Sequence, residues 1–466
     1  MTAEQQLRLA FYGDDFTGST DALEVLAFAG LRCALFLKPP SAELLDTLGN
    51  FDAIGVAGDS RSMSPEEMDQ ALPDTLSALA SLPVSLIHYK VCSTFDSSPT
   101  VGSIGRVMDL ARDAFGPGPI PIVAATPALG RYCVFGNLFA RSGTDGVVYR
   151  LDRHPIMSRH PTTPMTEADL AAHLGAQTRQ VLAKFTLASY EEGQSAMDAE
   201  LARLASSGAD GIVFDGTTSD HLTQVGRLLE QLGAGRSRPL FCIGSSGLEY
   251  AATQWWRENG TAEPTSTPQF ERFRGVETLL AVSGSASPLS KTQVDKAIEN
   301  GFVDIRVDAA SLVADEKWES ELSRLHGEAV AALRAGRSVI AHTARGPDDD
   351  RIKAMTSLLE SQGMRKDQAK HLGGRLLAQR LGRFVDGVLR EVRLERVVIS
   401  GGDTSSHVTR QLAPDALVVA ARLAPGAPLC RVISDQPHLS DLEIALKGGQ
   451  MGNSDYFVKA LRGTEK

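Results

Sequence analysis

The chain has 466 residues and a formal net charge of −10, with 42% hydrophobic and 22% charged residues. A chain of this length is too long for one ordinary hydrophobic core and predicts two domains. The acidic balance argues against a nucleic-acid scaffold, which usually carries a basic stripe. No apolar run has membrane-spanning length and residues 1–15 lack a signal-peptide pattern, so we expect a cytoplasmic protein without membrane contact.

The five cysteines are widely spaced, and no two of them form a CxxC pair. This spacing predicts neither a disulfide framework nor a zinc site. Reduced thiols are typical of a cytoplasmic protein. The residues are Cys33, Cys92, Cys133, Cys242 and Cys430.

In the first half of the chain, short apolar runs typical of strands alternate with helical patterns. After the first run, "STDALEVLAFAG" places Leu23, Leu26 and Ala27 on one helical face. Such alternation predicts βαβ units around a mostly parallel sheet. The predicted strands are residues 7–13, 53–58, 85–91, 120–127, 211–216 and 239–246.

A polar, proline-containing stretch without periodicity, residues 257–275, is typical of a linker. The alternation then resumes. We therefore predict two α/β domains with mostly parallel sheets, residues 1–256 and 276–466, and a ligand-binding cleft between them. The strands predicted after the linker are residues 278–287, 302–308, 338–344, 396–404 and 416–423, and a final segment spans 442–463.

Two adjacent carboxylates, Asp14 and Asp15 of "GDDFTGST", follow the first predicted strand. In open α/β sheets ligands bind at this strand edge. A helix opening at Gly18 and Ser19 would offer free N–H groups to an anion. Taken alone, such a pair is more typical of one helix cap beside one solvated carboxylate.

Two further strand ends carry cations. Lys90 ends a predicted strand, with Cys92, Ser93 and Thr94 in the following loop, and Arg61 in "GDSRSMS" follows another strand. Such groups could bind a carboxylate or sugar hydroxyls, because a lysine, hydroxyls and a guanidinium all form hydrogen bonds to these ligands. The structural alternatives are that the lysine snorkels to solvent, that the hydroxyls stabilise a turn and that the arginine lies on the surface. Because no base partner is visible for Cys92, a packed thiol is expected there rather than a nucleophile.

Three loops of small residues occur in the second half: "VSGSAS" (282–287), "ISGGDTSSHV" (399–408) and "LKGGQMG" (446–452). Glycines let phosphates approach the backbone, and a following helix supplies N–H donors. Asp403 or Thr404 is expected to cap the helix after the second loop. None of the loops matches GxxxxGK[ST] or GxGxxG, but together they predict nucleotide binding.

The stretch "HPIMSRHPTTPM" (154–165) contains two His-Pro pairs and predicts an ordered excursion rather than a helix or strand. His154 and His160 lie six residues apart without an obvious third ligand. A loop that shapes the cleft is favoured over a metal site.

Read together, these motifs resemble the four-carbon acid sugar kinase family. "GDDFTGSTD" is similar to that family's opening, and the later motifs follow in the family's order over nearly the whole chain. "CSTFDS" and "GGDTSS" look most like the 3-oxo-tetronate kinase branch. The later motifs are "YKVCSTFDS", "TPALGR" (126–131), "HPTTPM", "VSGSAS", "GGDTSS", "APGAP" (424–428) and "LKGGQMG".

The resemblance implies an acid-sugar-binding N-terminal domain and a nucleotide-binding C-terminal domain. The γ-phosphoryl group of ATP would be transferred, with Mg²⁺, to a terminal hydroxyl of a short sugar acid. The implied catalytic residues are Asp14 and Asp15, the implied substrate-binding residues are Arg61, Lys90, Cys92, Ser93 and Thr94, and the implied ATP-binding residues are Ser283, Gly284, Ser285, Gly401, Gly402, Asp403, Thr404 and Gly449.

From these residues we hypothesise that Arg61 and Lys90 fix the substrate's carboxylate or keto group and that Ser93 and Thr94 bind its hydroxyls. One of the two adjacent aspartates would accept the proton of the attacking hydroxyl, and the other would orient the first or meet Mg²⁺ through water. Asp403 could contribute to Mg²⁺ binding or cap a helix. Domain closure over the substrates is expected.

The chain departs from the 3-oxo-tetronate pattern at an additional "HPIM", at "KGGQMG" and in a polar stretch at 344–355. A related branch acts on the branched acid 3-oxo-isoapionate, and threonate or erythronate kinases are further alternatives. The substrate therefore stays open at this stage, as does a homodimer.

Two other classes compete with a kinase. A NAD(P)-dependent oxidoreductase would also use α/β domains, but no GxGxxG follows the first strand and the Asp pair would repel a pyrophosphate. A non-catalytic sugar-acid sensor would usually need an output module, and no helix-turn-helix or basic patch is visible.

Overall fold

The computed structural model describes residues 7–142, 146–160, 162–261, 270 and 272–464. It divides into two compact units, the first comprising residues 1–33 and 38–265 and the second residues 34–37 and 266–466. Of the predicted linker, 262–269 and 271 lie outside the described residues. The cleft expected between the domains stays a prediction.

The first unit contains a parallel sheet in the order β3-β1-β4-β11-β5-β10-β9. Strands β1 and β4 are buried along their whole length, as their near-continuous apolar sequences predict for a sheet covered on both faces. The strands are β1 (Leu9–Gly13), β3 (Ala53–Ala57), β4 (Leu86–Lys90), β5 (Ile120–Val123), β9 (Leu182–Phe185), β10 (Gly211–Phe214) and β11 (Leu240–Gly244).

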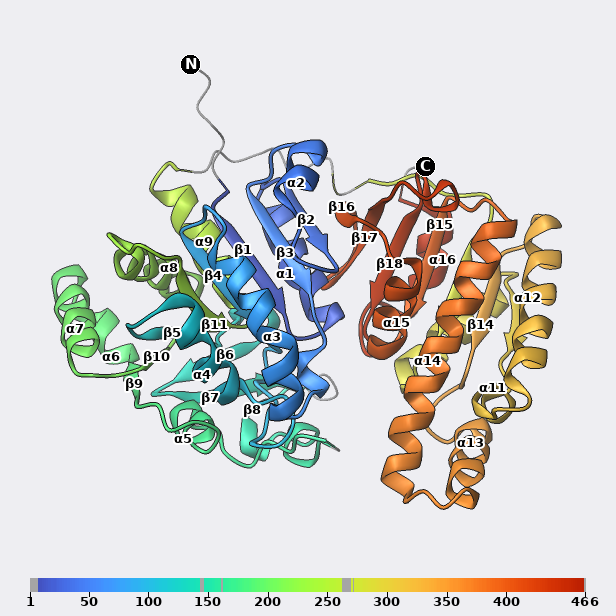
Figure 1. Ribbon diagram of the computed structural model, residues 1–466, viewed down its shortest axis with the longest axis horizontal. Helices are drawn as coiled ribbons and strands as arrows, with labels where there is room; N and C mark the ends of the chain where they lie inside the picture. The colour runs from blue at the N-terminus through green and yellow to red at the C-terminus, as the bar shows by residue number, and fades with distance from the viewer. Residues whose placement is uncertain (1–6, 143–145, 161, 262–269, 271, 465–466) are drawn as a thin grey trace. The chain divides into compact units, whose positions relative to one another are not determined.

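Helices cover this sheet, with α3 packed on α4 and with α9 packed on α1 and α8 (Figure 1). Helix α3 begins with a capping box, in which Ser64 and Glu67 exchange side-chain and backbone hydrogen bonds. The helices are α1 (Phe16–Phe28), α2 (Ala42–Leu48), α3 (Pro65–Ala80), α4 (Ile104–Phe115), α5 (Leu170–Gly175), α6 (Leu187–Glu191), α7 (Gln194–Ser206), α8 (Ser219–Gly233) and α9 (Gly247–Glu258).

A small antiparallel sheet, which no motif predicted, follows β5. It consists of β6 (Arg131–Val134), β7 (Asn137–Arg141) and β8 (Val148–Arg150). Asp215, directly after β10, accepts hydrogen bonds from the N–H groups of Phe135 and Gly136 at 2.6 and 2.8 Å. These bonds tie the β6–β7 turn to the main sheet.

The second unit has a sheet in the order β13-β14-β12-β15-β18-β17-β16-β2, parallel from β13 to β18 and antiparallel beyond. Strand β2 comes from the N-terminal part of the chain and pairs with β16 through Leu35 and Leu417. The strands are β2 (Cys33–Phe36), β12 (Leu280–Ser283), β13 (Val303–Arg306), β14 (Val339–His342), β15 (Arg396–Ser400), β16 (Ala416–Ala424), β17 (Ala427–Ile433) and β18 (Glu443–Lys447).

One face of this sheet forms a core with α10 and α16, in which Ala281, Val398 and Ala445 meet Val294 and Phe457. The long helix α14 packs against α12, α13 and α15 (Figure 1). The helices are α10 (Pro288–Glu299), α11 (Ala309–Val313), α12 (Trp318–Arg334), α13 (Asp350–Ser361), α14 (Lys366–Glu391), α15 (Gly402–Leu412) and α16 (Tyr456–Arg462).

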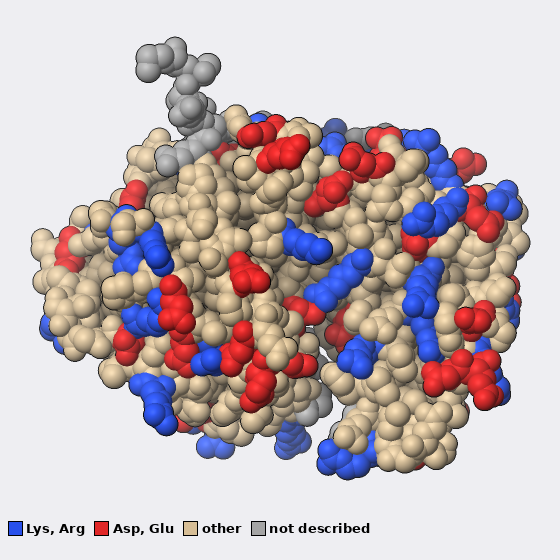
Figure 2. Space-filling model, in the orientation of Figure 1, with Lys and Arg blue, Asp and Glu red and all other residues tan. Residues whose placement is uncertain are grey.

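These sheets confirm the predicted α/β class with mostly parallel strands. On the face drawn in Figure 2, acidic and basic side chains are interspersed rather than gathered into a basic stripe. Among the described residues, no helix is both long and apolar enough to cross a lipid bilayer.

Candidate functional site

In the first unit, four strands end at the same edge of the sheet. Gly13 is in register with Ala57 and with Lys90, and Lys90 is in register with Gly244. The chain first moves from β1 to β3 on one side and later crosses to β4 on the other side of β1. The edge beside β1 is therefore a topological switch point, where open α/β sheets bind ligands.

Asp14 directly follows β1 and is buried. Its carboxylate accepts two hydrogen bonds from Arg61, from Nε at 3.1 Å and from Nη2 at 2.6 Å. Burial raises the pKa of Asp14 to about 6, even though the charge of Arg61 acts in the opposite direction. Asp14 is thus a carboxyl group that can exchange a proton close to neutral pH.

Asp15 has a different environment from its neighbour. It is the N-cap of α1 and accepts a hydrogen bond from the N–H of Gly18 at 2.6 Å. It also accepts from Nη1 of Arg61 at 2.6 Å. The helix therefore begins at Phe16, earlier than the predicted opening at Gly18, because the Asp15 side chain satisfies an N–H group of its first turn.

Lys90 ends β4 and is buried beside the same edge. Its Nζ donates to the carbonyl oxygen of Val91 at 3.1 Å and lies 3.5 Å from Oδ2 of Asp21. Burial alone would lower the pKa of Lys90, but the carboxylates of Asp21, Glu249 and Asp15 outweigh it and raise the pKa. Asp21 belongs to this edge although we did not single it out from the sequence, where it ends the motif "GDDFTGSTD".

The loop after β4 turns on local hydrogen bonds. Sγ of Cys92 lies 3.0 Å from Oγ1 of Thr94, which donates to Asp96 at 2.7 Å. Burial raises the pKa of Cys92 to about 11, which keeps the thiol protonated and agrees with a packed thiol rather than a nucleophile. Oγ of Ser93 accepts a hydrogen bond from Nε of Arg131 at 3.2 Å.

In the second unit, the three glycine-containing loops also leave one sheet edge together. Ser283 is in register with Ser400, and Ser400 with Lys447. The N–H of Gly284 donates to Ser400 and the N–H of Gly401 to Lys447, at 2.8 and 2.9 Å. The first bond connects loops that are more than a hundred residues apart in the sequence. The second connects loops that are separated by α15, β16 and β17.

The glycines of these loops are required by close packing. A Cβ atom on Gly284 would lie 1.9 Å from Oγ1 of Thr404, and one on Gly449 would lie 2.2 Å from Oγ of Ser285. Gly401 has a φ of 120°, which side chains disfavour. The hydroxyl of Ser283 is buried and has no hydrogen-bond partner among the described residues. An unsatisfied buried hydroxyl beside a glycine cradle fits a site that receives a ligand with acceptor oxygens.

Helix α15 begins in this cradle without a side-chain cap. Its N-cap is Gly401, so Asp403 and Thr404 lie in the first turn and neither caps the helix as we expected. The expectation failed because the chain enters the helix two residues earlier, through a glycine with positive φ. The first N–H groups of α15 are thereby left without a capping oxygen, and such groups bind phosphate.

Lys447 is a further residue of this edge that we did not identify from the sequence. It is fully buried, and its Nζ donates to Oγ of Ser400 at 2.9 Å and to the carbonyl oxygen of Gly448 at 3.0 Å. Burial lowers the pKa of Lys447 to about 7. The signal available in the sequence was a lysine at the end of a buried strand, directly before two glycines.

Two family models match the chain, one for a sugar-binding N-terminal domain over residues 9–252 and one for a nucleotide-binding C-terminal domain over residues 280–457. The chain belongs to the four-carbon acid sugar kinase family. The resemblance noted in the sequence is therefore confirmed, and the two matches fall on the units that carry the two strand edges described above.

Relatives with a named activity align with almost the whole length of the kinase. It is 43% identical over 453 residues to a 3-oxo-isoapionate kinase of Paraburkholderia graminis, covering 97% of this chain and 93% of the relative. It is 30% identical over 456 residues to a 3-oxo-tetronate kinase of Pseudomonas fluorescens, covering 97% and 96%. These relatives confirm the expectation of a sugar acid kinase.

A crystal structure of a Salmonella typhimurium LT2 protein shares the fold of the kinase. The TM-score is 0.75 at 24% sequence identity, and the match covers 98% of this chain and 99% of that one. At this identity, the likeness concerns the fold alone.

The histidines of the His-Pro stretch make local contacts in the kinase. Nδ1 of His154 accepts from the N–H groups of Ile156 and Met157, and Nδ1 of His160 accepts from the N–H of Thr163. Among the residues that the structure describes, no group of three or more His, Cys, Asp or Glu side chains could hold a metal ion.

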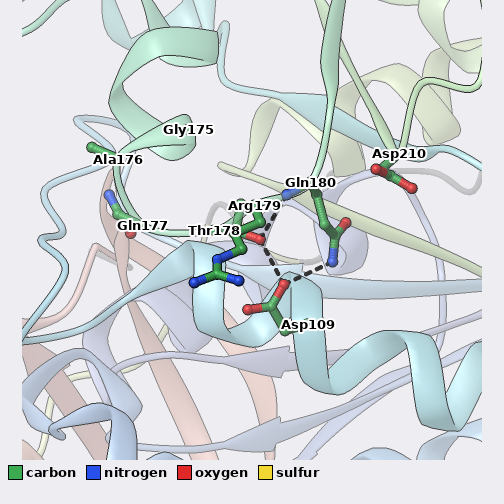
Figure 3. Close-up of a pocket in the computed structure, with 8 residues that line it drawn as sticks. All are labelled: Asp109, Gly175, Ala176, Gln177, Thr178, Arg179, Gln180 and Asp210. Carbon is green, nitrogen blue, oxygen red and sulfur yellow. Dashed lines mark hydrogen bonds between the residues drawn. The ribbon is translucent and has the colours of Figure 1, made fainter.

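A hollow of about 710 Å³ lies beside the beginnings of β9 and β10, where the connection from α5 to β9 passes α4 (Figure 3). The carboxylate of Asp109 points toward Thr178 and Gln180 and accepts hydrogen bonds from both, at 2.6 and 3.0 Å. These bonds are within the protein and hold the connection in place, so we assign the hollow no part in the kinase reaction.

Proposed function

We propose that this kinase uses ATP and Mg²⁺ to phosphorylate the terminal hydroxyl of a short 3-oxo sugar acid, with the branched acid 3-oxo-isoapionate preferred over 3-oxo-tetronate. The comparison with named relatives supports this order, because identity to the 3-oxo-isoapionate kinase is 43% and to the 3-oxo-tetronate kinase 30% over a similar length. The departures from the 3-oxo-tetronate pattern in the sequence point the same way.

Asp14 is proposed as the general base. The observation that carries this assignment is a buried carboxylate at the switch point of the sheet whose pKa is raised to about 6 by burial. In the reaction a bond forms between the substrate's hydroxyl oxygen and the γ-phosphorus while the bond to the β-phosphate oxygen breaks. Asp14 takes the hydroxyl proton.

Arg61 is proposed to position Asp14, and not to fix the substrate's carboxylate or keto group together with Lys90 as the sequence suggests. Nε, Nη1 and Nη2 already donate to Asp14 and Asp15. Substrate contacts are then left to Lys90 and to the hydroxyls of Ser93 and Thr94. Asp15 would hold α1 and the second side of the Arg61 guanidinium.

ATP supplies the phosphoryl group, and the glycine loops of the second unit are proposed to hold its phosphates. The unsatisfied hydroxyl of Ser283, the close approach at Gly284 and Gly449, and the uncapped start of α15 fit a polyphosphate. Lys447 would add a positive charge to this cradle.

Mg²⁺ is proposed to accompany the phosphates, because their charge must be neutralised during transfer. Asp403, exposed in the first turn of α15, is the carboxylate on this edge that we propose for it. We propose that the reaction takes place in the cytoplasm. A homodimer stays a prediction.

An ADP-release assay with Mg-ATP tests the proposal. The panel contains 3-oxo-isoapionate, 3-oxo-tetronates, D- and L-threonate and D-erythronate, with no-acid and NAD(P)-plus-acid reactions as controls. We expect kcat/KM for 3-oxo-isoapionate to exceed every other acid by about tenfold or more, the scale that one added or missing group gives. Equal or higher kcat/KM for a 3-oxo-tetronate would reverse the substrate order, and no turnover with any acid would refute the function.

A further inference from the structure

Arg131 is a half-buried cation near the sugar-acid edge; it ends the motif "TPALGR", but neither the sequence analysis nor the proposed reaction gives it a role. It is the first residue of β6, and its backbone is fixed by two hydrogen bonds with Thr126, at 3.0 and 3.1 Å. Gly130, with a φ of 68°, allows the tight turn that precedes it. The guanidinium is therefore carried by a backbone that the main sheet holds in place.

The side chain of Arg131 is directed to the loop that follows β4. Nε donates to Oγ of Ser93 at 3.2 Å, and Nη1 donates to the carbonyl oxygen of Leu129 at 2.6 Å. Burial lowers the pKa of Arg131, while Cys92 and Asp21 act in the opposite direction, which places it in the same charge environment as Lys90. An arginine stays protonated at physiological pH despite such a shift.

The charges at this edge are unevenly paired. The guanidinium of Arg61 is held by Asp14 and Asp15, and Lys90 lies 3.5 Å from Asp21. Within the described part of the chain, Arg131 has no carboxylate at ion-pair distance, and its Nη2, unlike Nε and Nη1, donates to no protein acceptor. A partly desolvated guanidinium without an anionic partner is costly unless a ligand supplies one.

We infer that Arg131, supported by Ser93, binds the carboxylate of the sugar acid. The inference rests on the proposed function and assigns the end of the substrate opposite to the reacting hydroxyl. A short sugar acid carries its carboxylate and its terminal hydroxyl at opposite ends, so Asp14 and the carboxylate-binding group must be different residues. A planar guanidinium matches a carboxylate through two parallel hydrogen bonds, which a lysine cannot reproduce.

Steady-state kinetics with Arg131→Gln and Arg131→Lys test this role, with Arg141→Gln as the matched control. Arg141 lies on the neighbouring strand β7 and is exposed, and among the described residues its side chain makes a long hydrogen bond, from Nη2 to Oη of Tyr132 at 3.4 Å. We expect Arg131→Gln to raise KM for the acid about 10- to 100-fold, the scale of one charge-assisted contact. KM for ATP should stay unchanged, Arg131→Lys should retain part of the affinity, and the control should behave like the wild type.

The carboxamide of the same substrate separates carboxylate binding from a structural role. In the wild type, KM for the carboxamide should exceed KM for the acid by about the same factor by which Arg131→Gln raises KM for the acid. In Arg131→Gln, KM should rise little further when the carboxamide replaces the acid. If Arg131→Gln raises KM relative to the wild type by the same factor for the acid and for the carboxamide, or keeps the wild-type KM, the inference is wrong. If this variant does not fold, Arg131→Lys and the wild-type carboxamide comparison decide instead.

Calorimetric binding of the acid without ATP distinguishes failure of the inference from failure of the proposed function. Acid binding that depends on Arg131 would uphold the inference even if the wild type releases no ADP. Turnover by the wild type with acid binding independent of Arg131 would refute the inference alone. Absence of acid binding to the wild type across the panel would refute both.

Discussion

Arg61 holds Asp14 through two parallel hydrogen bonds, at 3.1 and 2.6 Å, although the two residues are 47 positions apart. The same guanidinium reaches Asp15 through its third nitrogen. The two adjacent carboxylates are thereby distinguished, because Asp14 is buried at the end of β1 whereas Asp15 caps α1. This arrangement assigns testable and different consequences to their substitution.

Asp14→Asn should lower kcat by about 10²- to 10⁴-fold, the contribution typical of a general base. Asp15→Asn should stay within about tenfold of the wild type, because asparagine also caps helices well. Both are measured by ADP release at saturating substrates. Similar losses in the two variants would contradict the assignment of the base.

Asp15→Ala removes the cap as well as one partner of Arg61. We expect a loss of about 1 kcal/mol in the free energy of unfolding, measured by urea denaturation beside Asp15→Asn. The asparagine variant is the matched control and should lie close to the wild type. Equal destabilisation by both substitutions would show that the charge, and not the cap, is what stabilises the protein.

The pH dependence of kcat/KM should report Asp14. Because burial raises its pKa to about 6, kcat/KM should rise with pH through about 6 and then level off as the base becomes ionised. The contribution of Asp14 to the stability of the fold changes in the opposite direction, because it decreases as the pH rises. The folded state retains the proton to higher pH than the unfolded state, so this group's contribution to stability falls between about pH 4 and 6.

Asp14→Asn should therefore unfold at no lower temperature than the wild type at pH 7.5, since a neutral side chain suits this buried position. Differential scanning fluorimetry at pH 5 and 7.5 measures this.

For the kinetic prediction, a pH profile of kcat/KM without an inflection near 6, in a wild type whose turnover is limited by chemistry, would contradict the assignment of Asp14 as the base.

Lys447→Met should weaken ATP binding about tenfold or more, by the loss of one charge-assisted contact, without changing KM for the acid. Lys459→Met is the matched control, because Lys459 also donates to a backbone carbonyl in the second unit, that of Leu423. Calorimetry with ATP measures the effect. Equal ATP affinity in the wild type and in Lys447→Met would exclude Lys447 from the phosphate site.

The titration of Lys447 gives that prediction a second readout. Its pKa in the folded state is about 7, below the ordinary value of 10.5, so the unfolded chain binds more protons between these pH values. The stability contributed by this group therefore rises from about pH 7 to 10.5. Bound phosphate favours the protonated form, so ATP affinity should fall between pH 7 and 9, and Lys447→Met should lose this dependence.

Gly449→Ala and Gly284→Ala should raise KM for ATP, because the added methyl group would meet Ser285 or Thr404 at about 2 Å and force the loops apart. Gly327→Ala on α12 is the control, since its Cβ would meet nothing within 4 Å and alanine is the better helix former. ADP-release kinetics with varied ATP measure this. An unchanged KM for ATP in both loop variants would remove the glycine loops from the ATP site.

Much of the candidate site could be predicted from the sequence because the residues proposed to bind ligands directly follow strands. Asp14, Lys90, Ser283 and Gly401 lie at the ends of apolar runs, and parallel strands bring such ends to one edge. Strand runs and glycine loops are local patterns, so their interpretation does not require distant contacts. The motif order gave the family for the same reason.

The roles within the site depended on the tertiary structure. Burial and the contact with Arg61 distinguish Asp14 from Asp15, and both arise from residues that the sequence separates widely. The pairing of β2 with β16 and the hairpin that carries Arg131 had no recognised local pattern. Charge pairing is a property of three-dimensional neighbours, so only the folded chain shows that Arg61 is engaged and Arg131 lacks a carboxylate partner among the described residues.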